Sequence, residues 1–319
     1  MGTVLLDVAD ARGPHQRGWG RYVAKLAAAL GNAVIPVGPG PRAWGPELLW
    51  EQIGLARTAA RRRADLVHSP NCFLPLRRPC PGVVTVHDLA FEVFPDDFAP
   101  RTRWKYATFT KAAARSAERV IVPSSFTRDD VVARYGVAPG KVRVIPEAPA
   151  LPIGTSDVAP GDFLLAVGDL RAKKNLGVLV EAGRRLGLEV VLAGLGDAGP
   201  LSASHVRATG WVSDAELDEL MRSAAVLVHP SRYEGFGLVV VEAMARGVPV
   251  ACADATALPE TAAGAAELFD PADPAAVAAA IERALGRRDE LAAAGRARAA
   301  ELSWELAAAL TRAVYEELL

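Results

Sequence analysis

Residues 225–250 predict a strand, a loop and a helix in close succession, and this arrangement restricts the fold more than any other part of the chain. Residues 225–229 form an apolar run of strand type, and a turn containing two glycines follows in residues 230–237. Residues 238–246 predict a helix, which Gly247 ends. A strand that leads through a glycine loop into a helix is the repeating unit of an α/β domain.

The loop and the start of this helix could bind a ligand that carries both an anionic group and hydroxyl groups. Gly235 and Gly237 let the backbone approach a ligand closely, and a helix start carries about half a positive charge. The carboxylates of Glu234 and Glu242 can accept hydrogen bonds from paired hydroxyls. A diphosphate between two hydroxyl-rich rings, as in a nucleotide sugar, suits these groups. An ordinary strand, turn and helix with two solvated glutamates is the alternative.

The sequence of residues 234–250, EGFGLVVVEAMARGVPV, closely resembles the donor-site signature EGFGLPxLEAMAxGxPV of the retaining glycosyltransferases of family 4. The resemblance implies that Glu234 faces the donor sugar during catalysis and that Glu242 binds the ribose hydroxyls. It adds further residues to the donor-binding set: Gly235, Phe236, Gly237 and Leu238.

Three cations follow the predicted strand 163–167, namely Arg171, Lys173 and Lys174. Beside a helix start they could clamp a diphosphate and stabilise its charge as it leaves, and a solvated basic turn is the alternative. The resemblance assigns Lys174 to the diphosphate and to catalysis. Many family members carry arginine where this chain has Asp169, so Arg171 or Lys173 is the expected substitute.

The amino-terminal part of the chain adds one histidine and one glycine to the candidate site. His68 and His87 end predicted strands, where open α/β sheets hold their ligands. The segment TVHDLAF resembles a family segment whose histidine contacts the donor sugar, which favours His87 as a catalytic residue. The segment GWGRYVAKL resembles the family opening GxGRYxxxL, which lies between donor and acceptor and makes Gly18 a donor-binding candidate.

Two carboxy-terminal segments complete the prediction. Residues 209–212 predict a short strand, and the resemblance places Trp211 and Val212 at the nucleobase. Residues 274–302 predict an alanine-rich helical run that fills space in the second domain. Residues 303–319 predict an amphipathic helix capped by Ser303, which family members return to the first domain.

Charge is divided unevenly along the chain. Residues 1–150 hold 21 basic and 13 acidic residues, a balance of +8, whereas residues 151–319 hold 15 and 24, a balance of −9. The basic half suits an anionic acceptor or peripheral contact with headgroups at the inner face of a membrane. Attraction between the two halves explains the asymmetry equally well.

Several protein classes are disfavoured. No run of 18 apolar residues or signal peptide is evident, and three cysteines without CxxC spacing favour a reduced, cytoplasmic protein. No DxD motif occurs, so neither a metal nor another cofactor is expected, and no nucleic-acid partner is expected. A nicotinamide-dependent dehydrogenase would need a dinucleotide loop of GxGxxG spacing, and we do not expect such a loop in this chain.

A length of 319 residues and the alternation of strands and helices predict two α/β domains. The resemblance implies GT-B architecture, in which two Rossmann-like, doubly wound domains face each other across a cleft. Residues 1–150, with helix 303–319, would form the acceptor domain and residues 151–302 the donor domain.

The implied reaction moves a hexose, with retention, from a nucleotide diphosphate sugar to a hydroxyl of a glycan, a lipid-linked saccharide or a small molecule. GDP-mannose is favoured over UDP-sugars because GxGRYxxxL, TVHDL and KKN resemble mannosyl-transferring branches. A catalytically silent protein that binds a sugar nucleotide, or a GT-B epimerase, is the alternative.

Overall fold

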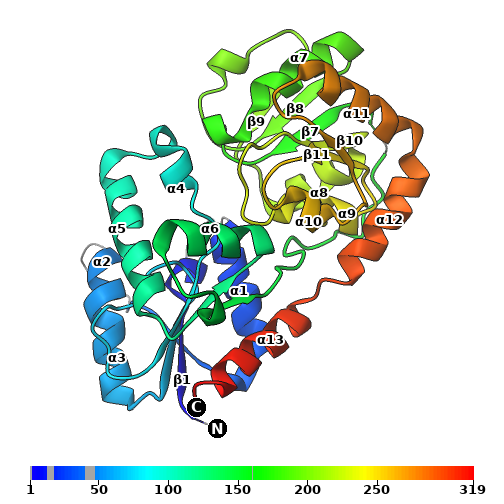
Figure 1. Ribbon diagram of the computed structural model, residues 1–319. Coiled ribbons are helices and arrows are strands. Elements are labelled where there is room, and N and C mark those ends of the chain that lie inside the picture. The colour runs from blue at the N-terminus through cyan, green and yellow to red at the C-terminus, as the bar shows by residue number, and fades with distance from the viewer. Residues whose placement is uncertain (1, 13–17, 40–46, 160) are drawn as a thin grey trace. The chain divides into compact units, whose positions relative to one another are not determined.

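The chain forms two compact units (Figure 1). Unit 1 comprises Met1–Glu147 and Ser303–Leu319, and unit 2 comprises Ala148–Leu302. The computed structural model describes residues 2–12, 18–39, 47–159 and 161–319. The division between the units falls three residues before the predicted one.

Unit 1 contains a six-stranded parallel sheet in the order β2-β1-β3-β4-β5-β6. Its strands are β1 (Val4–Asp7), β2 (Ile35–Val37), β3 (Leu66–Ser69), β4 (Gly82–Thr85), β5 (Arg119–Val122) and β6 (Val142–Val144). β1, β3 and β4 are buried at every position, as expected of apolar strands in a sheet covered on both faces. The strand order reverses direction between β1 and β3.

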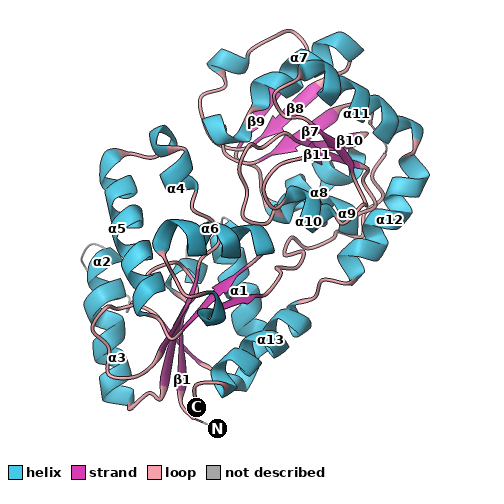
Figure 2. Cartoon of the chain, in the orientation of Figure 1, coloured by secondary structure: helices cyan, strands magenta, loops and turns pink. Residues whose placement is uncertain are grey.

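Helices cover both faces of the unit 1 sheet (Figure 2). They are α1 (Gly18–Leu30), α2 (Glu47–Leu49), a π-helical segment (Trp50–Gly54), α3 (Leu55–Arg62), α4 (Ala90–Val93), α5 (Pro100–Ser116), α6 (Ser125–Tyr135) and α13 (Trp304–Glu316). The Ser124 hydroxyl accepts a hydrogen bond from the Thr127 N–H at 3.1 Å and caps α6. The helical run from α2 to α3 has no counterpart in the sequence prediction.

Unit 2 contains a second six-stranded parallel sheet, in the order β12-β11-β10-β7-β8-β9. Its strands are β7 (Leu164–Val167), β8 (Val190–Ala193), β9 (Val206–Gly210), β10 (Val226–His229), β11 (Val250–Ala253) and β12 (Glu267–Phe269). Its helices are α7 (Leu176–Leu186), α8 (Asp214–Ser223), α9 (Leu238–Ala245), α10 (Leu258–Ala262), α11 (Pro274–Gly286) and α12 (Arg288–Ala300). The strand order is that of a dinucleotide-binding Rossmann sheet, and it reverses between β7 and β10.

Two predicted elements of unit 2 differ from the structure. The strand predicted at 209–212 is β9, which ends at Gly210, so Trp211 and Val212 lie beyond it. The helical run predicted at 274–302 is two helices, because the backbone leaves helical geometry at Arg287. The second of them, α12, packs against α9, where Gly295 leaves room for Met244. It therefore supports the helix that carries Glu242.

The carboxy-terminal helix α13 lies beside α1 within unit 1 (Figure 1). Its Tyr315 hydroxyl lies 2.6 Å from Nδ1 of His68, and Nε2 of His68 lies 2.9 Å from Oγ1 of Thr85. Burial lowers the pKa of His68 to about 3, so this imidazole is neutral. His68 is thus a structural residue that fastens α13 to the sheet.

Candidate functional site

The topology of unit 2 brings two distant loops to one edge of its sheet. β7 and β10 are neighbours at the point where the strand order reverses, and parallel neighbours end at the same edge. The loop after β7 carries Lys173 and Lys174, and the loop after β10 carries Glu234. Open α/β sheets bind their ligands at this position.

Glu234 is held between two cations. Its Oε1 lies 2.6 Å from Nζ of Lys174, and its Oε2 lies 3.6 Å from Nζ of Lys173. Nε2 of His229 lies 3.3 Å from Oε1, and the Glu234 residue is 8% exposed. Both carboxylate oxygens therefore face positive charge.

These surroundings fix the protonation states in the cluster. Burial by itself would raise the pKa of Glu234, but the charges of Lys173 and Lys174 hold it well below its usual range. Burial, followed by repulsion from Lys174, lowers the pKa of His229. At neutral pH Glu234 is therefore an anion and His229 is neutral, so Glu234 is suited to accept hydrogen bonds rather than to donate a proton.

Three residues that the sequence prediction did not include support the loops around Glu234. Asn175, in a left-handed conformation with φ 53°, donates to the carbonyls of Pro230 (3.3 Å) and Pro271 (2.7 Å). The Glu234 N–H donates to Oγ1 of Thr256 at 3.1 Å. His229, the third, was foreseeable as a polar residue at the end of a buried parallel strand.

Gly168 gives Lys174 its position. It follows β7 with φ 132°, a backbone conformation that residues with a side chain rarely adopt. A Cβ atom at this position would lie 3.0 Å from Cε and 3.2 Å from Nζ of Lys174. The glycine therefore leaves the space in which the lysine side chain runs to Glu234.

The predicted glycine loop forms the entry to α9. Gly237 precedes the first helical residue with φ 96°, and an added Cβ would lie 2.6 Å from the Leu258 side chain. The Phe236 carbonyl accepts a hydrogen bond from Oγ1 of Thr261 at 2.5 Å. Gly235 and Phe236 are buried, and Leu238 is half-buried. A rigid backbone thus presents the first turn of α9 beside Glu234.

Glu242 lies further along α9 and is 1% exposed. Its Oε1 accepts a hydrogen bond from the Leu151 N–H at 3.0 Å. The Glu242 carboxylate is therefore hydrogen-bonded to the segment that begins unit 2. Lys173 and Lys174 form their ion pairs with Glu234.

The remaining candidates have other surroundings. The Arg171 guanidinium pairs with Asp169 at 3.2 Å, so Lys173 is the candidate substitute that lies beside Glu234. Val212 packs against the core of unit 2. In unit 1, Gly18 is the exposed first residue of α1.

His87, just beyond β4 in unit 1, is bound at both ring nitrogens. Nδ1 lies 2.9 Å from Oε1 of Glu147, and Nε2 lies 2.9 Å from the Pro70 carbonyl. Both partners are oxygen acceptors when Glu147 is ionised, so each ring nitrogen donates a proton. Trp19 stacks on the ring at 5.6 Å, and Tyr22 meets it edge-on at 4.6 Å. The sequence prediction included neither Glu147 nor Trp19.

The pKa of His87 is raised, because the hydrogen bond and charge of Glu147 outweigh burial, which acts to lower it. The contribution of the His87–Glu147 pair to stability is therefore complete below about pH 6.5, the unperturbed pKa of histidine, and is lost as pH rises through the folded-state pKa.

We expect Glu147→Gln to lower the free energy of unfolding by about 1.5–3 kcal/mol at pH 6, the range for hydrogen bonds to charged groups. The difference in free energy of unfolding between the variant and the wild type should shrink at pH 9. Denaturant unfolding of both proteins at the two pH values measures this difference, and a difference that does not change with pH would contradict the prediction.

Residues 194–199, GLGDAG, have the GxGxxG spacing of dinucleotide-binding loops, which the sequence prediction overlooked. They follow β8, but they lead through a short 3-10 turn, Gly199–Leu201, into β9. The dinucleotide fingerprint needs an α-helix that starts at this loop. The prediction that the chain contains no GxGxxG loop is therefore wrong, although this loop lacks the α-helix that a dinucleotide site needs.

The three cysteines are free thiols. Burial raises the pKa of both Cys72 and Cys252 to about 12, so these thiols are unreactive at neutral pH. Within the described ranges, no group of three or more His, Cys, Asp and Glu side chains could hold a metal ion. No helix in the same ranges is long and apolar enough to cross a membrane.

Comparison with known families identifies both units. The family model described as Glycosyltransferase Family 4 matches residues 10–148, and the model described as Glycosyl transferases group 1 matches residues 161–287. The sucrose-phosphate synthase structure from Thermosynechococcus elongatus superposes with a TM-score of 0.74 at 22% identity, covering 100% of this chain and 99% of that one. This similarity shows the fold.

Two curated relatives extend the comparison. O-antigen chain mannosyltransferase B of Escherichia coli is 30% identical over 273 residues, which are 75% of this chain and 71% of that protein. MMP alpha-(1->4)-mannosyltransferase of Mycolicibacterium hassiacum is 30% identical over 315 residues, which are 85% of this chain and 75% of that protein. The chain therefore belongs to glycosyltransferase family 4 and is a glycosyltransferase with the GT-B fold.

Proposed function

We propose that the protein is a retaining mannosyltransferase that transfers mannose from GDP-mannose to a hydroxyl of a glycan. The observation that carries this proposal is the pairing of Lys173 and Lys174 with Glu234 where the strand order of unit 2 reverses. The mannosyl group is supported by the two relatives, both of which are named as mannosyltransferases.

The charges of the cluster favour a diphosphate. Lys173, Lys174 and Glu234 together carry one net positive charge, and the first turn of α9 adds the positive end of its dipole. On this proposal the lysines share their N–H groups between Glu234 and the diphosphate. Glu234, held as an anion, would accept hydrogen bonds from the mannose hydroxyls. Glu242 would accept those of the ribose.

The proposed step forms a bond between the acceptor oxygen and the anomeric carbon on the face that the leaving group vacates. The bond from that carbon to the phosphate oxygen breaks, and its electron pair stays on GDP. A phosphate oxygen takes the proton of the acceptor hydroxyl, so the products are the mannoside and GDP. Lys174 and Lys173 would stabilise the charge that develops on the leaving group, which is the role expected of preorganised cations.

His87 would contribute charge and position rather than proton transfer. Both of its ring nitrogens already donate to protein oxygens, from Glu147 and Pro70. A general acid or base needs a nitrogen within reach of the reacting group. We therefore assign no proton transfer to His87.

Thermal unfolding with a panel of GDP-, UDP- and dTDP-sugars tests the donor, with NAD and NADP as controls. A ligand at about a hundred times its dissociation constant adds about 2.7 kcal/mol, or a few degrees for domains of this size. We expect GDP-mannose to raise the unfolding temperature of the wild type, and the anomeric configuration of the product then tests retention by NMR.

Other outcomes would identify the alternatives. If only UDP-sugars stabilise the protein, the donor is a UDP-sugar and not GDP-mannose. Stabilisation by GDP-mannose without transfer to any offered manno-oligosaccharide would favour a catalytically silent binding protein. Stabilisation by NAD or NADP alone would contradict the proposal.

A further inference from the structure

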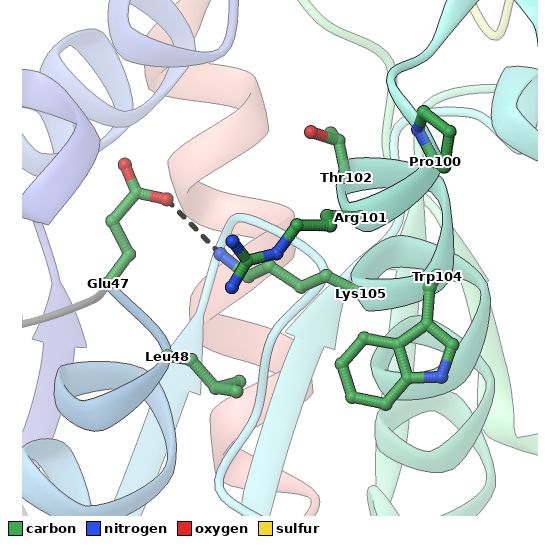
Figure 3. A pocket seen from close by; sticks show the side chains of 7 residues that line it. All are labelled: Glu47, Leu48, Pro100, Arg101, Thr102, Trp104 and Lys105. Atoms are coloured by element: carbon green, nitrogen blue, oxygen red, sulfur yellow. Dashed lines mark hydrogen bonds and ion pairs between the residues drawn. The ribbon is translucent and has the colours of Figure 1, made fainter.

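A pocket of about 520 Å³ lies in unit 1 between the start of α5 and α2 (Figure 3). Its volume falls within the range of about 300–1,000 Å³ found for small-molecule sites. The lining residues are Glu47, Leu48, Pro100, Arg101, Thr102, Trp104 and Lys105. The proposed function assigns no role to any of them.

The first turns of α5 build one wall of this pocket. Pro100 is the first residue of α5, and Arg101, Trp104 and Lys105 follow at the spacing that places side chains on one helix face. In Figure 3, Arg101 and Lys105 extend from α5 toward Glu47. An aromatic ring and several polar groups therefore face the same space.

Trp104 offers an exposed apolar surface. The residue is 60% exposed, although an indole of this size gains considerably from burial. Phe109 meets its ring edge-on at 6.0 Å, which limits how the ring can turn. An aromatic ring held in this way can pack against the C–H face of a sugar, whose hydroxyls then point outward.

The polar groups of the pocket include both signs of charge and match hydroxyl groups. Nζ of Lys105 lies 3.2 Å from Glu47 and 2.8 Å from Glu51, the second of which is buried. The lining itself holds two cations, Arg101 and Lys105, and one carboxylate, Glu47, whereas Glu51 pairs with Lys105 from outside the lining. Carboxylates accept and cations donate, so vicinal hydroxyls of a neutral sugar can satisfy both kinds of group. A strongly anionic ligand would meet Glu47.

A chain of aromatic contacts links this wall to His87 within unit 1. Tyr106, next to Lys105 on α5, lies 5.7 Å from the ring of Trp19, and Trp19 stacks on His87 at 5.6 Å. Lys105 also lies over the ring of Phe73 at 4.4 Å, and Phe73 meets Tyr106 edge-on. Lys105 of the pocket and His87 therefore belong to one packed cluster of side chains in unit 1.

We propose that this pocket is a subsite for a neutral hexopyranose unit of the acceptor glycan, with Trp104 against the C–H face of the ring. Arg101, Thr102 and Lys105 donate to its hydroxyls, and Glu47 accepts from them. The inference rests on the proposed function, in which the acceptor is a glycan. It adds that one sugar unit of this glycan reacts while another binds in this pocket.

Ligand-observed NMR with α-mannotriose as the probe tests this subsite on the full chain. We expect Trp104→Ala to raise the dissociation constant about tenfold, the effect of losing an aromatic contact and its buried area. Trp104→Phe should recover most of the affinity. Arg101→Ala should weaken binding, whereas the matched control Arg103→Ala, on the same helix but outside the pocket lining, should not.

The outcomes separate the subsite from the donor assignment. Absence of mannotriose binding by the wild type, or equal binding by Trp104→Ala, would overturn the subsite. Tighter binding of mannose 6-phosphate than of methyl α-mannoside through Arg101 would overturn its preference for a neutral sugar. GDP-mannose should stabilise Trp104→Ala as it does the wild type, which also shows that the variant is folded. If GDP-mannose stabilises neither the wild type nor Trp104→Ala, while mannotriose binding depends on Trp104, the donor proposal is wrong and the subsite proposal stands.

Discussion

Lys174→Ala is expected to lower kcat by about 10²- to 10³-fold, the range for removing one preorganised group that stabilises charge in the transition state. Its ammonium lies 2.6 Å from Glu234, on the loop that follows β7. The proposed leaving group gains negative charge at this place, so the loss should appear in kcat more than in the KM for the donor. Steady-state kinetics with GDP-mannose and mannotriose measure both constants.

Two further lysine variants control this prediction. Lys173→Ala should have a smaller effect, because its Nζ lies 3.6 Å from Glu234. Lys25→Ala removes an exposed lysine of α1 and should leave both constants unchanged. The unfolding temperature of each variant shows whether it is folded during the assay. A Lys174→Ala enzyme with the kcat of the wild type would remove this lysine from the catalytic assignment.

Glu242→Ala is expected to raise the dissociation constant of the donor by about 10- to 100-fold, which corresponds to the 1.5–3 kcal/mol of hydrogen bonds to a charged group. The same change removes the acceptor of the buried Leu151 N–H, so the free energy of unfolding should fall by about 1–3 kcal/mol. Donor titration below the unfolding temperature and denaturant unfolding measure the two effects separately.

Glu242→Gln distinguishes a ligand contact from a structural role. Glutamine keeps an oxygen that can accept from the Leu151 N–H but removes the negative charge. We expect it to recover most of the stability and only part of the donor affinity. Glu219→Ala, at an exposed position on α8, should change neither quantity. If Glu242→Ala loses stability but keeps full donor affinity, the residue is structural.

The sequence by itself determined several local features of this protein. The caps of α6, α8 and α13 at Ser124, Ser213 and Ser303 could be predicted, because a capping hydroxyl acts on N–H groups within a few residues. The glycine loop before α9 was predictable for the same reason, since a positive φ is a local requirement. The family, the fold class and the glycosyltransferase activity followed from the motif that these local features carry.

Only the tertiary structure decided which side chains meet. Lys174 and Glu234 are 60 residues apart and pair because β7 and β10 are neighbours, and a linear pattern does not state strand order. Likewise, Arg171 pairs with Asp169 and Lys173 lies beside Glu234, a difference that the sequence alone left open.

Tertiary contacts also decide how His68 and His87 differ. Both lie near the ends of buried strands. His68, however, meets Tyr315 from the far end of the chain and is neutral, whereas His87 meets Glu147 and its pKa is raised. Local sequence sets backbone geometry, but the charge state of a buried group depends on partners that only folding brings near.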